Sequence, residues 1–379
     1  MRARAAAVQL ALLAAVAFVL WYLASNTAAN LEARKIASGF AFLGREAGFE
    51  IGEAPFLAYG AADSYARAIV VGLINTFRVA VIGIALATLL GMVLGLARLS
   101  RNWLLAKFAA GYIEVVRNVP LLVQLFFLYA VITENLPGPR EALSPLAGVY
   151  FSNRGIAFPL PAPHAAHAWV LAALLAGAVL AWGLARWARA RQARTGQPFP
   201  VLGAGAALVL GLPLAVFLAA GAPLALARPE MQGFNFAGGA ILTPEFATLL
   251  FGLTLYTAAF IAEIVRAGVQ AVDRGQSEAA YSLGLPRSRT TRLVILPQAL
   301  RVIVPPLTSQ YLNLTKNSSL AVAIGYPDLV SIANTTMNQT GQAIEGIAII
   351  MAVYLTISLS ISALMNWYNA RIALKGARR

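Results

Sequence analysis

Long apolar stretches separated by short polar segments are the main pattern along this chain. Each stretch holds about twenty residues, the length of a helix that crosses the hydrocarbon layer of a membrane. The strands of a membrane barrel would instead show segments of about ten residues that alternate between apolar and polar. The strong candidate spans are residues 5–24, 69–97, 168–185, 201–220, 246–269 and 346–367. The pattern therefore predicts an all-α integral membrane protein.

Two further segments, residues 109–132 and 302–325, are less apolar because prolines and charges interrupt them. The positive charges indicate that both cross the membrane, since Lys and Arg collect in cytoplasmic loops. With eight spans and a cytoplasmic N-terminus, most of the 29 Lys and Arg residues lie on the cytoplasmic side. Without either doubtful span, a basic stretch at 186–194 or at the C-terminus would lie outside. We therefore predict about eight transmembrane helices, with both termini in the cytoplasm.

The first apolar stretch has a second interpretation, because Arg2 and Arg4 precede it as they would in a cleaved signal peptide. Its length favours a full crossing. The external loop at residues 26–65 is long enough for a short helix on the membrane surface, with its aromatic residues as anchors. The loop at 133–167 is rich in Pro, Gly and Asn and is expected to be irregular.

Composition supports the membrane interpretation and excludes several other classes. Of 379 residues, 59% are hydrophobic and only 12% are charged, well below the charged share of soluble domains. The absence of cysteine excludes disulfides, thiol catalysis and thiolate metal sites. A net charge of +14 is compatible with nucleic-acid binding. The basic residues lie where topology signals are expected, which makes a membrane protein the better explanation.

The motifs of common enzymes are absent from the sequence. No lysine follows a glycine, so the chain has no Walker loop for ATP, and neither Gly-x-Ser-x-Gly nor His-Glu-x-x-His occurs. The two histidines, His164 and His167, lie in an external loop, and a metal pair there would lack a third ligand. We therefore expect neither an enzyme nor a metal site.

The cytoplasmic loop at residues 274–304 has an ordered pattern. Ser277–Ala280 can begin a helix, residues 284–286 interrupt it, and residues 288–300 resume it with an apolar side. The pattern predicts two short helices at an angle, on a basic loop under the membrane. Such a hairpin suits a soluble partner that grips it, although a passive surface loop would have the same residue types.

Seven residues of this loop follow a fixed spacing: Glu278, Ala279, Ala280, Gly284, Val294, Leu296 and Pro297. The spacing resembles the EAA signature of ABC importer permeases, with Val294 where Ile is usual. Further stretches are similar to the polar amino acid branch of that family (HisMQ-like), and to the Q-type subunit of general L-amino acid permeases of Gram-negative bacteria. These stretches are residues 112–124, 263–266, 297–301, 316–320 and 338–345.

The resemblance implies a domain organisation with the type I ABC importer transmembrane fold and a five-helix core. It covers residues 65–133 and 244–371, which would be the two parts of that core. Residues 1–64 would be an N-terminal transmembrane helix plus a periplasmic segment. Residues 134–243 match no core element and are interpreted as inserted helices and loops.

The resemblance also implies the function and the partners. The chain would be the permease subunit of an importer for L-amino acids in the bacterial inner membrane. Glu278–Pro297 would be the coupling segment, held by a separate ATPase subunit that binds ATP and Mg²⁺. Gly284 would permit a bend that a side chain would obstruct, and Glu278 would cap the helix or pair with an arginine of the partner. A second, related permease, or a second copy, and a periplasmic amino-acid-binding protein would complete the assembly.

Ionisable and polar residues at membrane depth are candidates for the substrate pathway, because they are costly to bury. A zwitterionic amino acid needs a cation for its carboxylate and acceptors for its ammonium group. The candidates for these roles are Arg78, Glu263, Lys316, Asn317 and Ser318. Two pairs spaced three residues apart, Glu263 with Arg266 and Glu114 with Arg117, can equally be structural ion pairs.

The alternative function is an ion-coupled secondary amino acid transporter. It would explain the spans and the buried charges equally well. It gives no reason for the Glu-Ala-Ala spacing in a basic cytoplasmic loop. The sequence does not indicate which amino acids are carried.

Overall fold

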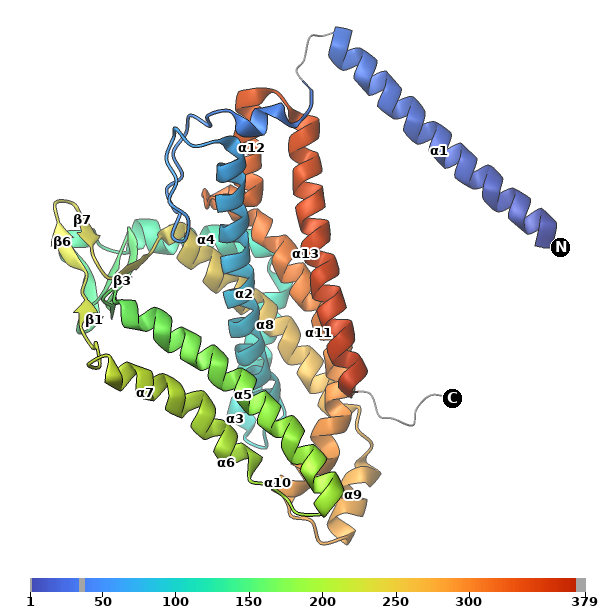
Figure 1. The fold of residues 1–379 in the computed structure, drawn as a ribbon, viewed down its shortest axis with the longest axis vertical. Helices are drawn as coiled ribbons and strands as arrows, with labels where there is room; N and C mark the ends of the chain where they lie inside the picture. Colours follow the sequence, from blue (N-terminus) through green and yellow to red (C-terminus); the bar gives the residue numbers. More distant parts are fainter. Residues whose placement is uncertain (1, 34–37, 373–379) are drawn as a thin grey trace. The chain divides into compact units, whose positions relative to one another are not determined.

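The computed structural model describes residues 2–33 and 38–372, and these form two structural units. One unit contains the chain up to Tyr129 together with the chain from Glu245 onward, and the other is Ala130–Pro244. Figure 1 shows the helices of both. Because their mutual placement is not fixed, each unit is described by itself.

Long helices build the first unit. Six helical segments of the described chain are long and apolar enough to span a membrane, four of them in this unit: Ala7–Thr27, Tyr65–Arg98, Pro244–Gln270 and Ala343–Arg371. They lie in α1 (Arg2–Ala33), α2 (Tyr65–Arg98), α8 (Pro244–Gln270) and α13 (Ala343–Ile372). The remaining elements are η1 (Phe40–Gly44), α3 (Trp103–Asn118), α4 (Leu121–Asn135), α9 (Arg274–Ser282), α10 (Arg287–Thr290), η4 (Thr291–Ile295), α11 (Leu296–Asn317), η5 (Ser318–Ile324) and α12 (Leu329–Thr340).

The two doubtful spans differ from straight apolar helices. Residues 109–132 fall in α3 and α4, which bend by 104° at Val119 and Pro120. Proline disfavours helix in the residue before it, and the Gln124 amide donates to the carbonyls of Val116 and Val119 at 2.8 and 2.9 Å, which stabilises the bend. The other segment lies in α11 and η5, and α11 is a 22-residue helix that carries Pro305 and Pro306. The prediction of helix in both places is confirmed, but the break at Pro120 was not predicted.

Close contact between α2 and α8 depends on glycine. A Cβ atom on Gly91 would lie 2.6 Å from Cβ of Ile261, and one on Gly95 would lie 2.7 Å from the Ala262 carbonyl oxygen. Small residues let membrane helices approach at backbone distance. Helix α8 is accordingly the most buried span of the described chain, since 67% of the residues in its most apolar stretch are buried.

The external loop packs on this unit over its described residues 38–64 and does not form a surface helix there. The helical turn in this stretch is η1, whose Phe42 is buried against Tyr65 and Val71. Ile51 joins the same cluster. The prediction that these side chains anchor the loop to the membrane surface is wrong for Phe42 and Ile51, because both are buried in the protein's own core.

The unit Ala130–Pro244 combines a helical hairpin with short strands. Helix α5 (Ala165–Thr195) packs along α6 (Val201–Ala206), the π-helical η3 (Ala207–Gly211) and α7 (Leu212–Ala219), as Figure 1 shows. His164 caps α5, since its Nδ1 accepts a hydrogen bond from the Ala166 amide at 3.1 Å. The hairpin supplies two further segments apolar enough to span, Ala165–Thr195 and Val201–Ala219.

The segment expected to be irregular contains strands. A four-stranded antiparallel sheet has the order β1 (Leu143–Leu146), β2 (Val149–Ser152), β3 (Gly155–Phe158) and β8 (Ala240–Leu242). Two further antiparallel pairs join β4 (Leu160–Pro161) to β5 (Leu226–Ala227), and β6 (Glu230–Gln232) to β7 (Asn235–Ala237). A short 3-10 turn, η2 (Pro139–Glu141), precedes them. Strands of two to four residues are too short for an alternating pattern to reveal them.

Candidate functional site

The predicted coupling segment begins with α9, a helix that Asp273 caps. The Asp273 carboxylate accepts a hydrogen bond from the Gly275 amide at 2.7 Å. The helix therefore starts at Arg274, three residues before the predicted start at Ser277. Glu278 lies in the middle of α9 with an exposed side chain, so the expectation that it caps the helix is wrong. An arginine partner for Glu278 on another subunit stays a prediction.

Gly284 ends the first helix in the left-handed region, with φ +75°. The Gly284 amide donates to the Tyr281 carbonyl at 2.9 Å, and the Leu285 amide donates to the Ala280 carbonyl at 3.1 Å. A Cβ atom on Gly284 would meet nothing within 4 Å. The requirement for glycine therefore comes from the backbone conformation and not from an obstructed side chain, which corrects the expected reason.

The second part of the segment continues into a long helix. Helix α10 leads through the π-helical η4 into α11, and Val294, Leu296 and Pro297 lie at this junction. The Gln298 amide donates to the Val294 carbonyl at 3.0 Å and to the Gln276 side-chain oxygen at 3.2 Å. Through Gln276, helix α9 is joined directly to the start of α11. The predicted interruption at Gly284 is confirmed, but the second helix is not short as predicted, because it continues through η4 into α11.

Apolar side chains on this segment face outward. Leu283 is 82% exposed, and Tyr281, Leu293 and Ala279 are also exposed. Ala280 is buried within the chain. Exposed apolar groups of this size on a basic loop are typical of a docking surface. Leu283 and Leu293 were not among the predicted site residues, although their apolar character amid Arg287, Arg289 and Arg292 was a usable signal.

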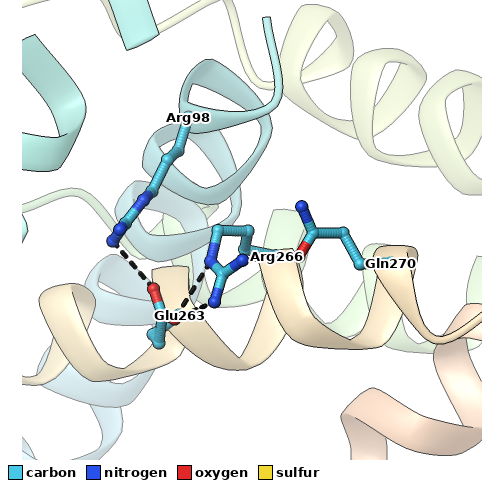
Figure 2. A network of polar contacts seen from close by, with 4 residues as sticks. All are labelled: Arg98, Glu263, Arg266 and Gln270. Atoms are coloured by element: carbon cyan, nitrogen blue, oxygen red, sulfur yellow. Dashed lines mark hydrogen bonds and ion pairs between the residues drawn. The ribbon is translucent and has the colours of Figure 1, made fainter. Parts of the chain in front are cut away.

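Glu263 on α8 lies between two arginines, as Figure 2 shows. Arg98 at the end of α2 donates from Nη1 to Glu263 Oε2 at 2.9 Å, and Arg266 donates from Nε to Oε1 at 3.0 Å. Arg266 also contacts the side-chain oxygen of Gln270. The structure thus forms the ion pair that was one of the two interpretations of Glu263 and Arg266. It adds Arg98, which was not predicted from the sequence.

Arg78 on α2 forms an ion pair with Glu53 of the external loop. Its guanidinium lies 3.7 Å from the centre of the Phe246 ring on α8. The side chains of both partners are largely buried. Arg78 therefore joins three parts of the unit, and a substrate carboxylate would compete with Glu53 for it.

A buried polar cluster lies beside this pair at the turn before α12. The Asn75 amide donates to the carbonyls of Glu53 and Pro327 at 2.8 and 2.9 Å. The Leu329 amide donates to the Thr76 hydroxyl at 3.0 Å. Helix α2 is thereby joined to the turn that carries Asp328.

Asp328 is fully buried and caps α12, accepting a hydrogen bond from the Ser331 amide at 2.8 Å. Burial raises the pKa of its carboxyl group to about 7, although backbone amides around it oppose the rise. Asp328 was not among the predicted site residues. Its position after Pro327, directly before a helix, is a capping pattern that was available.

The other predicted pathway residues are spread along the end of α11. Lys316 is exposed, Asn317 is half-buried, and Ser318 is buried with its hydroxyl donating to the Thr315 carbonyl at 2.7 Å. Within the described residues, no hydrogen bond or ion pair joins these three to Arg78 or Glu263. Their common role in a pathway stays a prediction.

Glu114 and Arg117 on α3 are both exposed. Over the described ranges 2–33 and 38–372, the ion pairs do not include these two residues. The Arg117 guanidinium instead lies 5.0 Å from the centre of the Phe260 ring. The structural-pair interpretation therefore fails for Glu114 and Arg117.

Comparison with known proteins gives a consistent result. The family described as "Binding-protein-dependent transport system inner membrane component" matches residues 83–374. The general L-amino acid transport system permease protein AapQ of Rhizobium johnstonii is 51% identical over 95% of this chain and 89% of its own length. The putative amino-acid ABC transporter permease protein YhdX of Escherichia coli is 52% identical over 96% and 93%. The glutamate/glutamine/aspartate/asparagine transport system permease protein BztB of Rhodobacter capsulatus is 42% identical over 99% and 95%.

Proposed function

We propose a detailed role for this chain from the premise that it belongs to the family of binding-protein-dependent transport inner membrane components. Its role is that of a permease subunit of an ABC importer for L-amino acids, forming half of the translocation pathway. Permeases of amino acid transporters, about half identical over nearly the whole chain, support this substrate class. A multi-pass inner membrane location follows from the family and the apolar helices. The ion-coupled secondary transporter is not supported, because these relatives are named as transport-system permeases.

The observation that carries the mechanism is the geometry of the coupling segment. Helix α9 exposes Glu278 and Ala279, Leu283 directly after it is also exposed, and Gly284 then turns the chain sharply. The Gln276–Gln298 hydrogen bond joins α9 to α11. When the ATPase moves α9, this hydrogen bond makes α11 move with it, so that the motion reaches the membrane-embedded part of the chain. Rigid elements that move as bodies are the usual basis of such transitions.

The partners follow from the chemistry that this chain lacks. Since the sequence holds no Walker loop, ATP and Mg²⁺ are bound by two separate ATPase subunits that receive α9 in a cleft. A second permease, related or identical, forms the other half of the pathway. A periplasmic binding protein delivers the amino acid. The chain itself is a translocation subunit without catalytic residues, and both its termini are cytoplasmic.

The substrate pathway is built from the polar residues of the first unit. Arg78, Glu263, Lys316, Asn317 and Ser318 are the proposed contacts to the passing amino acid. Arg78 would release Glu53 to bind a carboxylate, and Glu263 would exchange one of its arginines for an ammonium group. Each exchange replaces one ion pair with another, and the displaced group, Glu53 or one of the arginines, then needs water or a new partner.

The test is the ATP dependence of transport in the assembled complex. Gly284→Val with its β-branched side chain disfavours the left-handed turn, and Glu278→Ala alters the exposed face of α9. Both variants should assemble but lose most substrate-stimulated transport per ATP hydrolysed, measured in liposomes with ATP inside. Gly183→Val is the matched control, since a Cβ atom on Gly183 of α5 would meet nothing within 4 Å. Full coupling in the Gly284 and Glu278 variants would contradict the proposal.

A further inference from the structure

The helical hairpin of the Ala130–Pro244 unit buries very little of its own surface. Only 6% of the apolar window of α5 and none of that of α6–α7 is buried inside the protein. The rings of Trp187 on α5 and Phe199 in the turn before α6 are in contact, with their centres 5.4 Å apart. Apart from the faces on which its own helices meet, the hairpin is therefore largely uncovered within its unit.

Helix α5 is longer than the membrane it crosses. Its 31 residues extend over roughly 46 Å, against about 30 Å for the hydrocarbon layer. The apolar part ends at Ala185, and the last turns carry four arginines. These turns therefore reach the level of the lipid headgroups. The arginines are Arg186, Arg189, Arg191 and Arg194.

These arginines have no acidic partner within their own unit's hairpin. The sequence contains no Asp or Glu between Glu141 and Glu230. Two arginines of α2, by contrast, are paired with carboxylates, Arg78 with Glu53 and Arg98 with Glu263. Four cations without a carboxylate, at headgroup level, leave room for an external anion.

Tryptophan rings orient two of the guanidinium groups. Arg186 lies 4.3 Å from the centre of the Trp182 ring, and Arg191 lies 5.6 Å from that of Trp187. Stacking leaves the edge of a planar guanidinium available to donate to phosphate oxygens. Arg191 also donates from Nη2 to the Gln197 side-chain oxygen at 3.3 Å, so its other N–H groups would be the ones that reach a phosphate. Arg189 donates to the Ala185 carbonyl at 3.0 Å through Nε, which leaves its terminal nitrogens available. Tryptophan is also the residue that anchors helices at the membrane interface.

We propose that Arg186, Arg189, Arg191 and Arg194, with Trp182 and Trp187, form a binding site for the headgroup phosphate of anionic phospholipids in the cytoplasmic leaflet. The leaflet rests on the proposed orientation of the chain. The site gives the inserted hairpin a ligand of its own, separate from the amino acid pathway. Bound lipid would anchor the end of the hairpin at the membrane surface.

The test measures lipid binding to the full chain, purified and delipidated in detergent. Native mass spectrometry counts bound dioleoyl phosphatidylglycerol and, separately, dioleoyl phosphatidylcholine. The wild type should prefer phosphatidylglycerol by about tenfold or more, and the preference should weaken at high salt. Replacement of all four arginines by glutamine should reduce the preference to about threefold or less.

Two variants keep the test independent of misfolding. The fourfold Arg→Lys variant preserves charge and topology signals, and should retain a reduced preference for phosphatidylglycerol because lysine lacks the planar fork. The matched control replaces Arg140, Arg154 and Arg228, arginines of the same unit outside the hairpin helices, by glutamine, and should leave the preference unchanged. An unchanged preference in the fourfold Gln variant, or equal loss in the control, would overturn the proposal.

Three further outcomes decide between sources and partners. Displacement of phosphatidylglycerol by excess inorganic phosphate would assign the site to free phosphate. Loss of ATPase co-purification in the fourfold Gln variant, with lipid preference intact, would assign the arginines to a protein contact. Gln192→Cys, the sole cysteine in such a chain, should react with a membrane-impermeant maleimide only from the cytoplasmic side. Labelling from outside would overturn the proposed leaflet and orientation, whereas the test of coupling to ATP hydrolysis does not depend on it.

Discussion

Helices α8 and α5 are similarly apolar but differ greatly in how much of their surface is buried. In the most apolar stretch of each helix, 67% of the residues of α8 are buried, compared with 6% of those of α5. The difference lies in the residues between the apolar ones. Helix α8 meets glycines of α2 and carries Thr248, Thr254 and Thr257 inside, whereas α5 presents Leu, Val and Trp outward over most of its length. Both helices approach a neighbour at a glycine, since a Cβ atom on Gly177 of α5 would lie 2.4 Å from the Leu208 carbonyl oxygen, so the buried threonines are what set α8 apart.

The largest expected effect is the pH dependence of the stability of the first unit, to which α8 belongs. The folded-state pKa of Asp328 is about 7, above the value of 3.8 for a free carboxyl group. A raised pKa means that protonated Asp328 favours folding, so its contribution is complete below about pH 4 and is lost as the pH rises through 7. Between pH 5 and pH 8 the loss is on the order of 2–3 kcal/mol.

Asp328→Asn isolates that contribution, because asparagine can keep the cap of α12 without ionising. The titratable groups that interact with Asp328 are Tyr326 and Tyr354, and they are the same in both proteins. Thermal unfolding of the purified chain at several pH values measures the difference. The wild type should lose stability relative to the variant between pH 5 and pH 8, and a constant difference would contradict the assignment.

The second prediction concerns glycine at a helix contact. Gly91→Leu forces a side chain into Ile261 and should destabilise the unit by about 2 kcal/mol, as overpacking of cores does. Gly183→Leu on α5 places the same side chain where nothing lies within 4 Å. Melting temperatures in detergent compare the two. Equal losses would mean that α5 is packed as tightly as α8.

The smallest effect is expected at the ion pairs in Figure 2. Glu263→Gln leaves Arg98 and Arg266 facing each other without their carboxylate, and the partial exposure of all three side chains limits the cost to about 1 kcal/mol. Arg189→Gln on α5 removes a charge that pairs with no carboxylate in the described chain and should change stability by less than about 0.5 kcal/mol. A double-mutant cycle of Arg98 with Glu263 measures the coupling directly. A coupling energy of zero would contradict the pair.

Sequence identified the long helices and the interruption at Gly284 well, because both depend on local pattern. Apolar length reveals α2 and α8, and the fixed spacing around Gly284 reveals α9 and its turn. What sequence missed depends on residues far apart in the chain. Glu53 as the partner of Arg78, Arg98 as the partner of Glu263 and the pairing of Ile156 with Leu242 all require the folded contact. Local pattern also misassigned the cap of α9, since Glu278 and Asp273 are both acidic and only the start of the helix distinguishes them.

The Asn75 amide has a consequence for biosynthesis. One of its acceptors, the Pro327 carbonyl, lies 252 residues later in the chain. At ribosomal rates of about 5–20 residues per second, α2 leaves the ribosome roughly 13–50 seconds before that acceptor is made. During this interval the Glu53 carbonyl, made earlier, can accept one N–H of the amide, and the other N–H must bond to water or to the backbone of the helix. Membrane insertion of α2 and completion of its polar contacts are therefore separate events. The translocon releases α2 before the Pro327 carbonyl has been synthesised.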